Sequence, residues 1–375
     1  MRIVIDTKNL ALYKGGIAHW FSPLLAAWID HRQDAQFLLI GPPFDTEFLP
    51  QCSNWEYVPV PWPKWLLRPF RHPWYDNVLF PRALTRLRPD LVLSPYHDVR
   101  MPKGVPSVIG VHDLCLDEMA TVYPRRVRLY YLAMLRSNLR QASHVITVSQ
   151  TTRDKLARQY GVPFGRISVV YNAATPHFGI SAHADAITEF KMRFAKGGHL
   201  VLYPGGSEFR KNVDRLAESF SYLVQKVSNL TLLVTGNEDE RWIAVLGRLP
   251  SSTRDRVVFA GKLSDEELRL AYAAADAVVY PSLCEGFGRV CLEAMEAGVP
   301  LACSDLPVMR EVAGDYACYF YPYDIESIAD GISSALAKGP QQAVMHQRFS
   351  AQDVKESFLL TMGGFMEGLQ KNNKS

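Results

Sequence analysis

Short apolar runs rich in β-branched residues alternate with longer amphipathic stretches along the whole chain. In the first half the apolar runs fall at 2–6, 36–41, 90–95, 106–113, 144–149 and 167–172. The pattern then begins again, with runs at 199–206, 230–237, 257–262, 277–282 and 299–304. Strands alternating with helices predict a parallel sheet covered by helices. The repeat of the pattern predicts an α/β fold with two doubly wound parallel-sheet domains.

The domain boundaries follow from where this periodicity fades. A chain of 375 residues exceeds what one core usually holds. The pattern is lost after residue 173, so we expect one domain over 1–175 and a second over 176–350. Residues 351–375 predict a last helix that packs on one domain or crosses between them. Two such domains would face a central cleft, and clefts are where ligands bind.

Charge is distributed unevenly between the two halves. Residues 1–172 hold 21 Lys and Arg against 13 Asp and Glu, a balance of +8, and the remaining 20 and 25 give −5. The stretches 61–77 and 123–141 combine aromatic residues with Lys and Arg. They suit docking on an anionic bilayer. A helical core face with a solvated basic back would produce the same pattern.

The run that begins at residue 199 ends in a candidate phosphate site. Gly205 and Gly206 make a turn, Arg210 and Lys211 follow it, and Asn212 is placed to cap the next helix. Two adjacent cations beside free helix N–H groups can hold a diphosphate without a metal ion.

Two carboxylates flank a glycine-rich turn in the segment CEGFGRVCLEAMEAG, residues 284–298. Gly286 and Gly288 permit tight turning after a strand, so Glu285 should lie in a loop and Glu293 one turn inside a helix. A catalytic acid and base would need both carboxylates at one reacting centre. This spacing instead favours contacts with two parts of one extended ligand, and we expect Glu296 to face solvent.

The first half offers looser candidates. Gly15 and Gly16 open a helix after the first strand, where N–H groups can meet an anion, but an ordinary turn fits equally well. They do not form the G-x-G-x-x-G fingerprint, which disfavours an oxidoreductase. His112 lies at a strand end, and a structural histidine is the alternative interpretation. The histidines lack metal-ligand spacing, so no metal site is expected.

These motifs together resemble the GT-B glycosyltransferases, specifically the retaining family 4. The segment from Glu285 to Glu293 resembles the E-x(7)-E motif of that family, and Gly205 to Asn212 resembles its donor-phosphate segment. Residues 111–113, 144–150 and 261–282 also fit. The resemblance implies a GT-B fold of two Rossmann-like domains, with the acceptor held by the first and a nucleotide sugar by the second.

The resemblance also implies a role for each matching residue. Arg210 and Lys211 would neutralise the diphosphate leaving group, and Glu293 would bind the ribose hydroxyls. His112 would contact the sugar near the reacting carbon. The remaining donor-binding positions implied are Gly15, Gly16, Gly205, Glu285, Gly286, Phe287 and Gly288. Arg289 stands where the family usually has an aliphatic residue, and it either adds a phosphate contact or points away.

The implied activity is retaining, metal-independent transfer of a hexose from a GDP- or UDP-sugar to a saccharide or lipid-linked acceptor. No cofactor beyond this donor substrate is expected. General resemblance and the basic aromatic first half favour GDP-mannose and bacterial surface polysaccharide or glycolipid synthesis. Without a recognisable signal peptide or spanning segment, we expect a cytoplasmic protein, peripheral at the inner face of the membrane.

Other functions remain open at this point. A sugar-nucleotide epimerase or hydrolase of the same architecture would carry the same donor site. A non-catalytic, membrane-associated protein that binds nucleotide sugars would carry it too. A nucleic-acid partner is not expected, because no binding motif is present and the second half is acidic.

Overall fold

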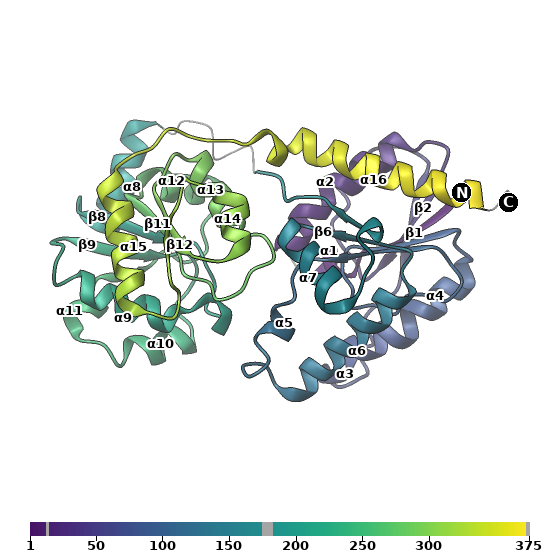
Figure 1. Ribbon diagram of the computed structural model, residues 1–375, viewed down its shortest axis with the longest axis horizontal. Helices are drawn as coiled ribbons and strands as arrows, with labels where there is room; N and C mark the ends of the chain where they lie inside the picture. The colour runs from purple at the N-terminus through teal and green to yellow at the C-terminus, as the bar shows by residue number, and fades with distance from the viewer. Residues whose placement is uncertain (13–14, 175–182, 373–375) are drawn as a thin grey trace. The chain divides into compact units, whose positions relative to one another are not determined.

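The computed structural model describes residues 1–12, 15–174 and 183–372. The chain forms two compact units, Met1–Ala173 with Gln352–Ser375 (unit 1) and Ala174–Ala351 (unit 2). Each unit is a parallel sheet covered by helices (Figure 1). The expected α/β class with two doubly wound sheets is confirmed. In the described ranges, no helix combines the length and the apolar character needed to cross a bilayer.

Within the described part of unit 1, seven parallel strands pair in the order β3-β2-β1-β4-β5-β6-β7. The chain first adds strands on one side of β1 and then continues on the other, so the strand order reverses between β1 and β4. Such a reversal opens a crevice at the carboxyl ends of the two strands. The strands are β1 (Arg2–Asp6), β2 (Gln36–Gly41), β3 (Trp55–Pro59), β4 (Leu91–Ser94), β5 (Ser107–Val111), β6 (His144–Thr147) and β7 (Ile167–Val169).

The helices of unit 1 include the last one of the chain. The rings of Trp28 and Phe21 on α2 meet Phe358 of α16 edge to face, with centroids 5.8 and 6.4 Å apart. This contact ties residues 352–372 to unit 1. The helices are α1 (Lys8–Leu12), α2 (Gly16–His31), α3 (Arg68–Trp74), the π-helical η1 (Tyr75–Leu79), α4 (Phe80–Leu87), α5 (Cys115–Glu118), α6 (Arg125–Gln141), α7 (Gln150–Tyr160), the 3-10 turn η2 (Phe164–Arg166) and α16 (Ala351–Asn372).

In unit 2, the described residues form six parallel strands in the order β10-β9-β8-β11-β12-β13. Here the strand order reverses between β8 and β11. The strands are β8 (His199–Tyr203), β9 (Leu230–Val234), β10 (Val257–Phe259), β11 (Ala277–Tyr280), β12 (Leu301–Ser304) and β13 (Cys318–Phe320).

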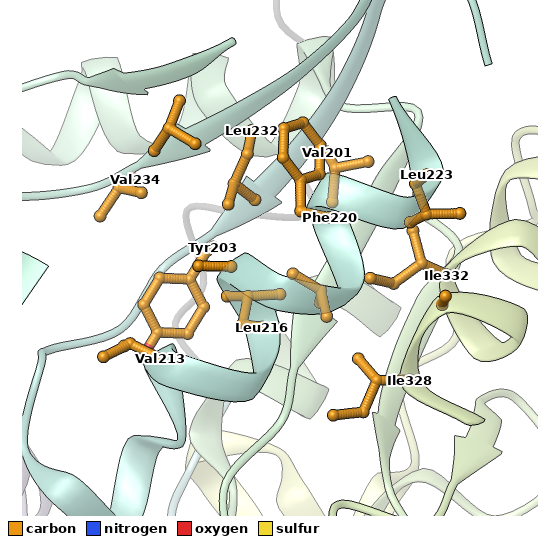
Figure 2. Close-up of a cluster of buried hydrophobic side chains, with 14 of the residues drawn as sticks. Val201, Tyr203, Val213, Leu216, Phe220, Leu223, Leu232, Val234, Ile328 and Ile332 are labelled. Carbon is orange, nitrogen blue, oxygen red and sulfur yellow. The ribbon is translucent and has the colours of Figure 1, made fainter. Parts of the chain in front are cut away.

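The core of unit 2 lies between its sheet and two helices, α9 (Val213–Leu223) and α15 (Ile325–Lys338) (Figure 2). Burial of a Leu, Ile or Phe side chain contributes roughly 1.5–3 kcal/mol, so this cluster holds the sheet rigidly beneath the loops. The other helices are α8 (Ala184–Ala195), α10 (Glu240–Leu246), α11 (Ser251–Arg254), α12 (Asp265–Ala274), α13 (Arg289–Glu296), α14 (Pro307–Ala313) and the 3-10 turns η3 (Phe209–Lys211) and η4 (Gln347–Phe349).

Two strands were not expected from the sequence, β3 and β13. Both lie at the edge of a sheet. They are half-buried rather than fully buried, and an edge strand therefore lacks the continuous apolar run of a central parallel strand.

Candidate functional site

The loop after β8 begins the candidate site of unit 2. Tyr203, the last residue of β8, donates a hydrogen bond from its hydroxyl to the carbonyl of Gly206 at 2.6 Å. A Cβ at Gly205 would lie 2.5 Å from the Tyr203 ring, so this position requires glycine. The two glycines let the chain fold closely over the tyrosine and lead it into η3, which carries Arg210 and Lys211.

Arg210 and Lys211 meet one carboxylate oxygen from the loop after β11. The Nη1 of Arg210 and the Nζ of Lys211 each lie 2.7 Å from Oε1 of Glu285. The backbone joins the same two loops, because the N–H of Leu283 donates to the carbonyl of Arg210 at 2.7 Å. The structure thus brings together three of the residues singled out in the sequence, at the reversal point between β8 and β11.

The charges of this cluster set the state of Glu285. Burial opposes ionisation of the carboxyl, but Lys211 and Arg210 overcome it and lower the pKa of Glu285 to about 2. Glu285 is therefore an anion at neutral pH. Lys211 Nζ also donates to the hydroxyl of Tyr280 at 3.1 Å. Tyr280 ends β11 and was not singled out in the sequence, although its place before the loop could have indicated it.

Asn212 holds the loop in a way that the sequence did not predict. It occupies the position before α9, but its side chain does not cap the helix. Its Nδ2 donates to the carbonyl of Pro322 at 2.7 Å, and its backbone is left-handed, with φ +59°. Asparagine tolerates this conformation better than most residues. The expected cap is wrong: the side chain anchors the loop to the segment before α15 instead.

The glycine-rich turn before α13 is held by packing. Gly288 has φ +100°, and a Cβ there would lie 2.8 Å from the sulfur of Met309. Both observations require glycine. The side chain of Phe287 is buried and its ring packs edge to face on Phe349, with centroids 5.6 Å apart. The Phe287 ring therefore anchors the turn.

Glu293 lies on α13, as the sequence predicts, and is buried between two partners. Its Oε2 accepts from the Tyr272 hydroxyl at 2.5 Å, and its Oε1 accepts from Arg289 at 3.0 Å. Arg289 thus contacts Glu293 rather than pointing away from the site. Glu296, which we expected at the surface, is buried, and that prediction is wrong. The sequence did not single out Tyr272, because a tyrosine in a helical pattern predicts only a core residue.

His112 follows β5 in unit 1 and is held by close packing. Its Nε2 lies 2.9 Å from the carbonyl of Pro95, and its ring meets Trp20 edge to face at 4.8 Å. Burial lowers the pKa of His112, so the ring is neutral at pH 7. Because a carbonyl only accepts, the proton belongs on Nε2, and Nδ1 is left as an acceptor. A role beside the transferred sugar stays a prediction.

Gly15 and Gly16 lie where the sequence places them, at the start of α2. Gly15 is extended, and its carbonyl accepts from the N–H of His19 at 3.1 Å. A Cβ at Gly16 would meet no atom within 4 Å among the described residues. Packing therefore does not explain the second glycine, and its expected approach to the donor stays a prediction.

Comparison with known proteins identifies the family. A family model described as Glycosyl transferases group 1 matches residues 186–351, and one described as Glycosyltransferase Family 4 matches residues 19–177. The two matches together span most of the chain. The chain belongs to the family 4 glycosyltransferases. The resemblance on which the sequence analysis rested is confirmed.

Two relatives of this family 4 chain are bacterial mannosyltransferases. The O-antigen chain mannosyltransferase RfbU of Salmonella typhimurium is 29% identical over 246 residues, which cover 65% of this chain and 64% of that protein. The O-antigen chain mannosyltransferase B of Escherichia coli is 30% identical over 254 residues, covering 66% and 65%. The matched region spans less than two thirds of each relative.

Solved structures show that the family 4 chain has the GT-B fold. WaaG, a glycosyltransferase of lipopolysaccharide biosynthesis, aligns with a TM-score of 0.70 and 19% identity, covering 96% of this chain and 94% of its own. HepE of Anabaena, solved with UDP-glucose, aligns with a TM-score of 0.72 and 18% identity, covering 97% and 100%.

Proposed function

We propose that this protein is a retaining, metal-independent hexosyltransferase that uses a nucleotide diphosphate sugar and a saccharide or lipid-linked acceptor. The observation that carries the proposal is the meeting of Arg210 and Lys211 at Glu285, at the reversal point of the unit 2 sheet. Ligands of open α/β sheets bind at such points. Two cations side by side match the two phosphates of a donor.

The proposed chemistry is electrostatic. When the bond from the sugar to the phosphate breaks, positive charge grows on the sugar and negative charge on the diphosphate. Lys211 and Arg210 stabilise the leaving group, because cations that are already in place need no reorganisation during the reaction. Glu285 holds both cations in position before the donor binds and then accepts hydroxyl groups of the hexose. The acceptor hydroxyl attacks from the face that the diphosphate leaves, and its proton passes to that phosphate.

For the donor we propose GDP-mannose. The two mannosyltransferase relatives support mannose, and the process favoured is assembly of bacterial surface polysaccharide. HepE was solved with UDP-glucose, which makes UDP-sugars the alternative donors. Glu285 by itself does not select one hexose, since a carboxylate accepts hydroxyl groups of any of them.

The proposal is tested first by ligand binding. We expect GDP-mannose, and GDP more weakly, to raise the melting temperature in a panel that also contains UDP-glucose, UDP-galactose, UDP-N-acetylglucosamine and NAD. Ligands that bind the native state stabilise it by mass action. Stabilisation by NAD alone would overturn the proposal. Stabilisation by a UDP-sugar alone would overturn GDP-mannose as the donor, but the proposed hexosyltransferase activity would still stand.

A radiolabelled donor then separates the alternatives. We expect label to move into a lipid or polysaccharide fraction only when a bacterial lipid extract is added, with α-configured donor giving α-linked product. Release of free sugar without an extract indicates a hydrolase, interconversion of the donor indicates an epimerase, and binding without any turnover indicates a non-catalytic protein. The activity should persist in excess EDTA, and its loss there would overturn metal independence.

We further propose that unit 1 docks on an anionic bilayer through residues 64–71 and the start of α6. Trp65 and Leu67 are each 73% exposed, and Phe70 is 58% exposed. Arg68 lies among them, and neither 61–75 nor 123–141 contains an acidic residue. Exposed aromatic residues among cations suit headgroups and the interface beneath them. Tyr75, by contrast, is buried and belongs to the core.

Vesicle flotation tests this surface. The protein should float together with vesicles that contain phosphatidylglycerol. With vesicles of pure phosphatidylcholine it should stay in the bottom fraction of the gradient. The double variant Trp65→Ala/Phe70→Ala should lose flotation. The control is Phe164→Ala, which removes an aromatic ring that is 55% exposed from η2, outside the basic aromatic stretches. Equal loss in both variants, or equal binding to both vesicles, would contradict docking.

A further inference from the structure

The reversal point of the unit 1 sheet holds a second cluster of charged side chains, which the donor site does not use. β1 and β4 pair with Ile5 beside Leu93, so their carboxyl ends lie together. Ser94 donates from its hydroxyl to Asp6 at 2.9 Å across this point. In unit 2 the same topological position, between β8 and β11, carries the meeting of Arg210, Lys211 and Glu285.

The centre of this cluster is a fully buried ammonium group. The Nζ of Lys8, at the start of α1, lies 2.5 Å from Asp76 of η1 and 2.7 Å from Asp98 in the turn after β4. Asp76 is buried, whereas the Asp98 side chain is 27% exposed. The cluster is therefore closed on the side of Asp76 and reaches solvent on the side of Asp98.

The cluster has more negative than positive charge. Asp76 and Asp98 pair with the ammonium, and a third carboxylate, Asp6, accepts from the backbone N–H of Lys8 at 3.0 Å. Burial raises the pKa of Asp6 to about 6, and it raises the pKa of Asp76 as well. An excess of acceptors attracts hydroxyl donors and repels anions. Lys8 already lies between two of the carboxylates, where a metal ion would need to bind.

Buried polar atoms around the cluster lack partners among the described residues. They are Oδ1 of Asp98 and the hydroxyl of Tyr75. Tyr75 is fully buried, and its ring centroid lies 5.7 Å from the Nζ of Lys8. Burial raises the pKa of Tyr75, and the negative charges of Asp6, Asp76 and Asp98 raise it further. Its hydroxyl therefore faces the cluster. Buried polar atoms are nearly always satisfied in native proteins, and the hydroxyl groups of a ligand can supply the partners of these two atoms.

Aromatic rings lie next to the cluster. Trp62 packs on Tyr75 with centroids 5.1 Å apart and on His72 with centroids 4.7 Å apart. The Tyr130 hydroxyl donates to Asp76 at 3.2 Å and accepts from Asn77 at 3.0 Å. Carboxylates that accept hydroxyl groups beside aromatic rings that cover C–H faces suit a hexopyranose, which is polar at its rim and apolar on its faces.

We propose that Lys8, Asp76 and Asp98, with Tyr75 and Tyr130, form a subsite for the hydroxyl groups of a neutral hexopyranoside. Given the proposed glycosyltransferase function, on which this assignment of the ligand rests, the hexopyranoside is the acceptor. Asp98 contacts the sugar directly, and Lys8 and Asp76 hold Asp98 in position. An anion is disfavoured by the charge of the cluster.

The test measures glycoside binding without any nucleotide. Saturation-transfer NMR is recorded with the methyl glycosides of mannose, galactose, glucose and N-acetylglucosamine. We expect at least one to bind the wild-type protein and Asp98→Asn to weaken that binding roughly tenfold or more, because a hydrogen bond to a charged group is lost. Tyr130→Phe, which keeps the ring, should weaken it less. The matched control is Asp154→Asn on α7, a partly exposed aspartate in unit 1 that pairs with Arg153.

Binding of GDP and UDP and the melting temperature are measured on the same variants. The proposal requires nucleotide binding to stay within about twofold of wild type. Asp98→Asn also removes a partner of the buried Lys8, so its melting temperature should fall, and glycoside binding is compared well below that temperature. Wild-type protein that binds none of the four glycosides overturns it, and so does Asp98→Asn that binds them like wild type. The protein could instead bind a glycoside in an Asp98-dependent way but bind no nucleotide sugar. That result would support the subsite and overturn the glycosyltransferase proposal.

Discussion

Nζ of Lys211 lies 2.7 Å from Oε1 of Glu285, although 74 residues separate them in the chain. The contact spans the reversal point between β8 and β11, and Arg210 reaches the same oxygen. A buried carboxylate holds two cations together before any ligand arrives. In the proposed reaction, the cations then bind the diphosphate without first having to approach each other against their repulsion.

Replacing Lys211 tests the leaving-group role. We expect Lys211→Ala to lower kcat about 100-fold or more, because removing one preorganised group that stabilises transition-state charge has costs of that order. Steady-state kinetics with the donor identified by thermal shift would measure it. The control is Lys226→Ala, which removes an exposed lysine that donates a hydrogen bond to the Tyr222 hydroxyl at the surface. Similar kcat values for the two variants would contradict the role.

Replacing Glu293 tests ribose binding. Wild type should bind the nucleoside diphosphate at least about tenfold more tightly than its 2′,3′-dideoxy analogue, since lost hydrogen bonds to a charged group are worth that much. Glu293→Gln should lose this preference. Tyr272→Phe, which removes a partner of Glu293 but not the carboxylate, should keep it. Titration calorimetry gives all six affinities, and a preference that survives in Glu293→Gln would exclude the ribose contact.

The decrease in the free energy of unfolding at acid pH should reveal the ion pairs of Glu285. Its pKa is near 2 in the folded protein and 4.5 as the ordinary value, so the unfolded chain binds the proton more tightly. The stabilisation is complete above pH 4.5 and is lost as pH falls toward 2. The unfolding free energy of wild type minus that of Glu285→Gln should therefore decrease by up to about 3 kcal/mol over this range. Urea titrations at several pH values measure it; a pH-independent difference would refute the ion pairs.

The contribution of Asp6 to the free energy of unfolding should depend on pH in the opposite direction. Burial raises its pKa from 3.8 to about 6, against the opposing charge of Lys8 and with a smaller contribution from Asp98. The folded protein then holds the proton more tightly than the unfolded chain. Stability due to this group is present below pH 4 and decreases as pH rises through 6. Relative to wild type, Asp6→Asn should gain stability between pH 4 and 7 in the same urea titrations. A relative loss over that interval would show that Asp6 is ionised throughout.

Much of unit 2 was readable in the sequence because its signals are local. The central strands are continuous apolar runs, and Glu285 and Glu293 are placed by glycines within a few residues of them. The edge strands β3 and β13 were missed because they contain few β-branched residues, whereas the edge strands β7 and β10, which are also half-buried, carry Ile and Val. Glu296 was misplaced because its burial depends on elements that pack on α13 from elsewhere in the chain.

The sequence by itself determined the fold class and the family, since these depend on periodicity and on short motif spacings. Only the tertiary structure decided which charges meet. Arg210 and Lys211 find Glu285, and Lys8 finds Asp98, because parallel strands on either side of a reversal point bring distant loops to one edge of a sheet. The packing of η1 adds Asp76 to the second cluster. The energies of such contacts depend on distance and burial, and neither is encoded in local sequence.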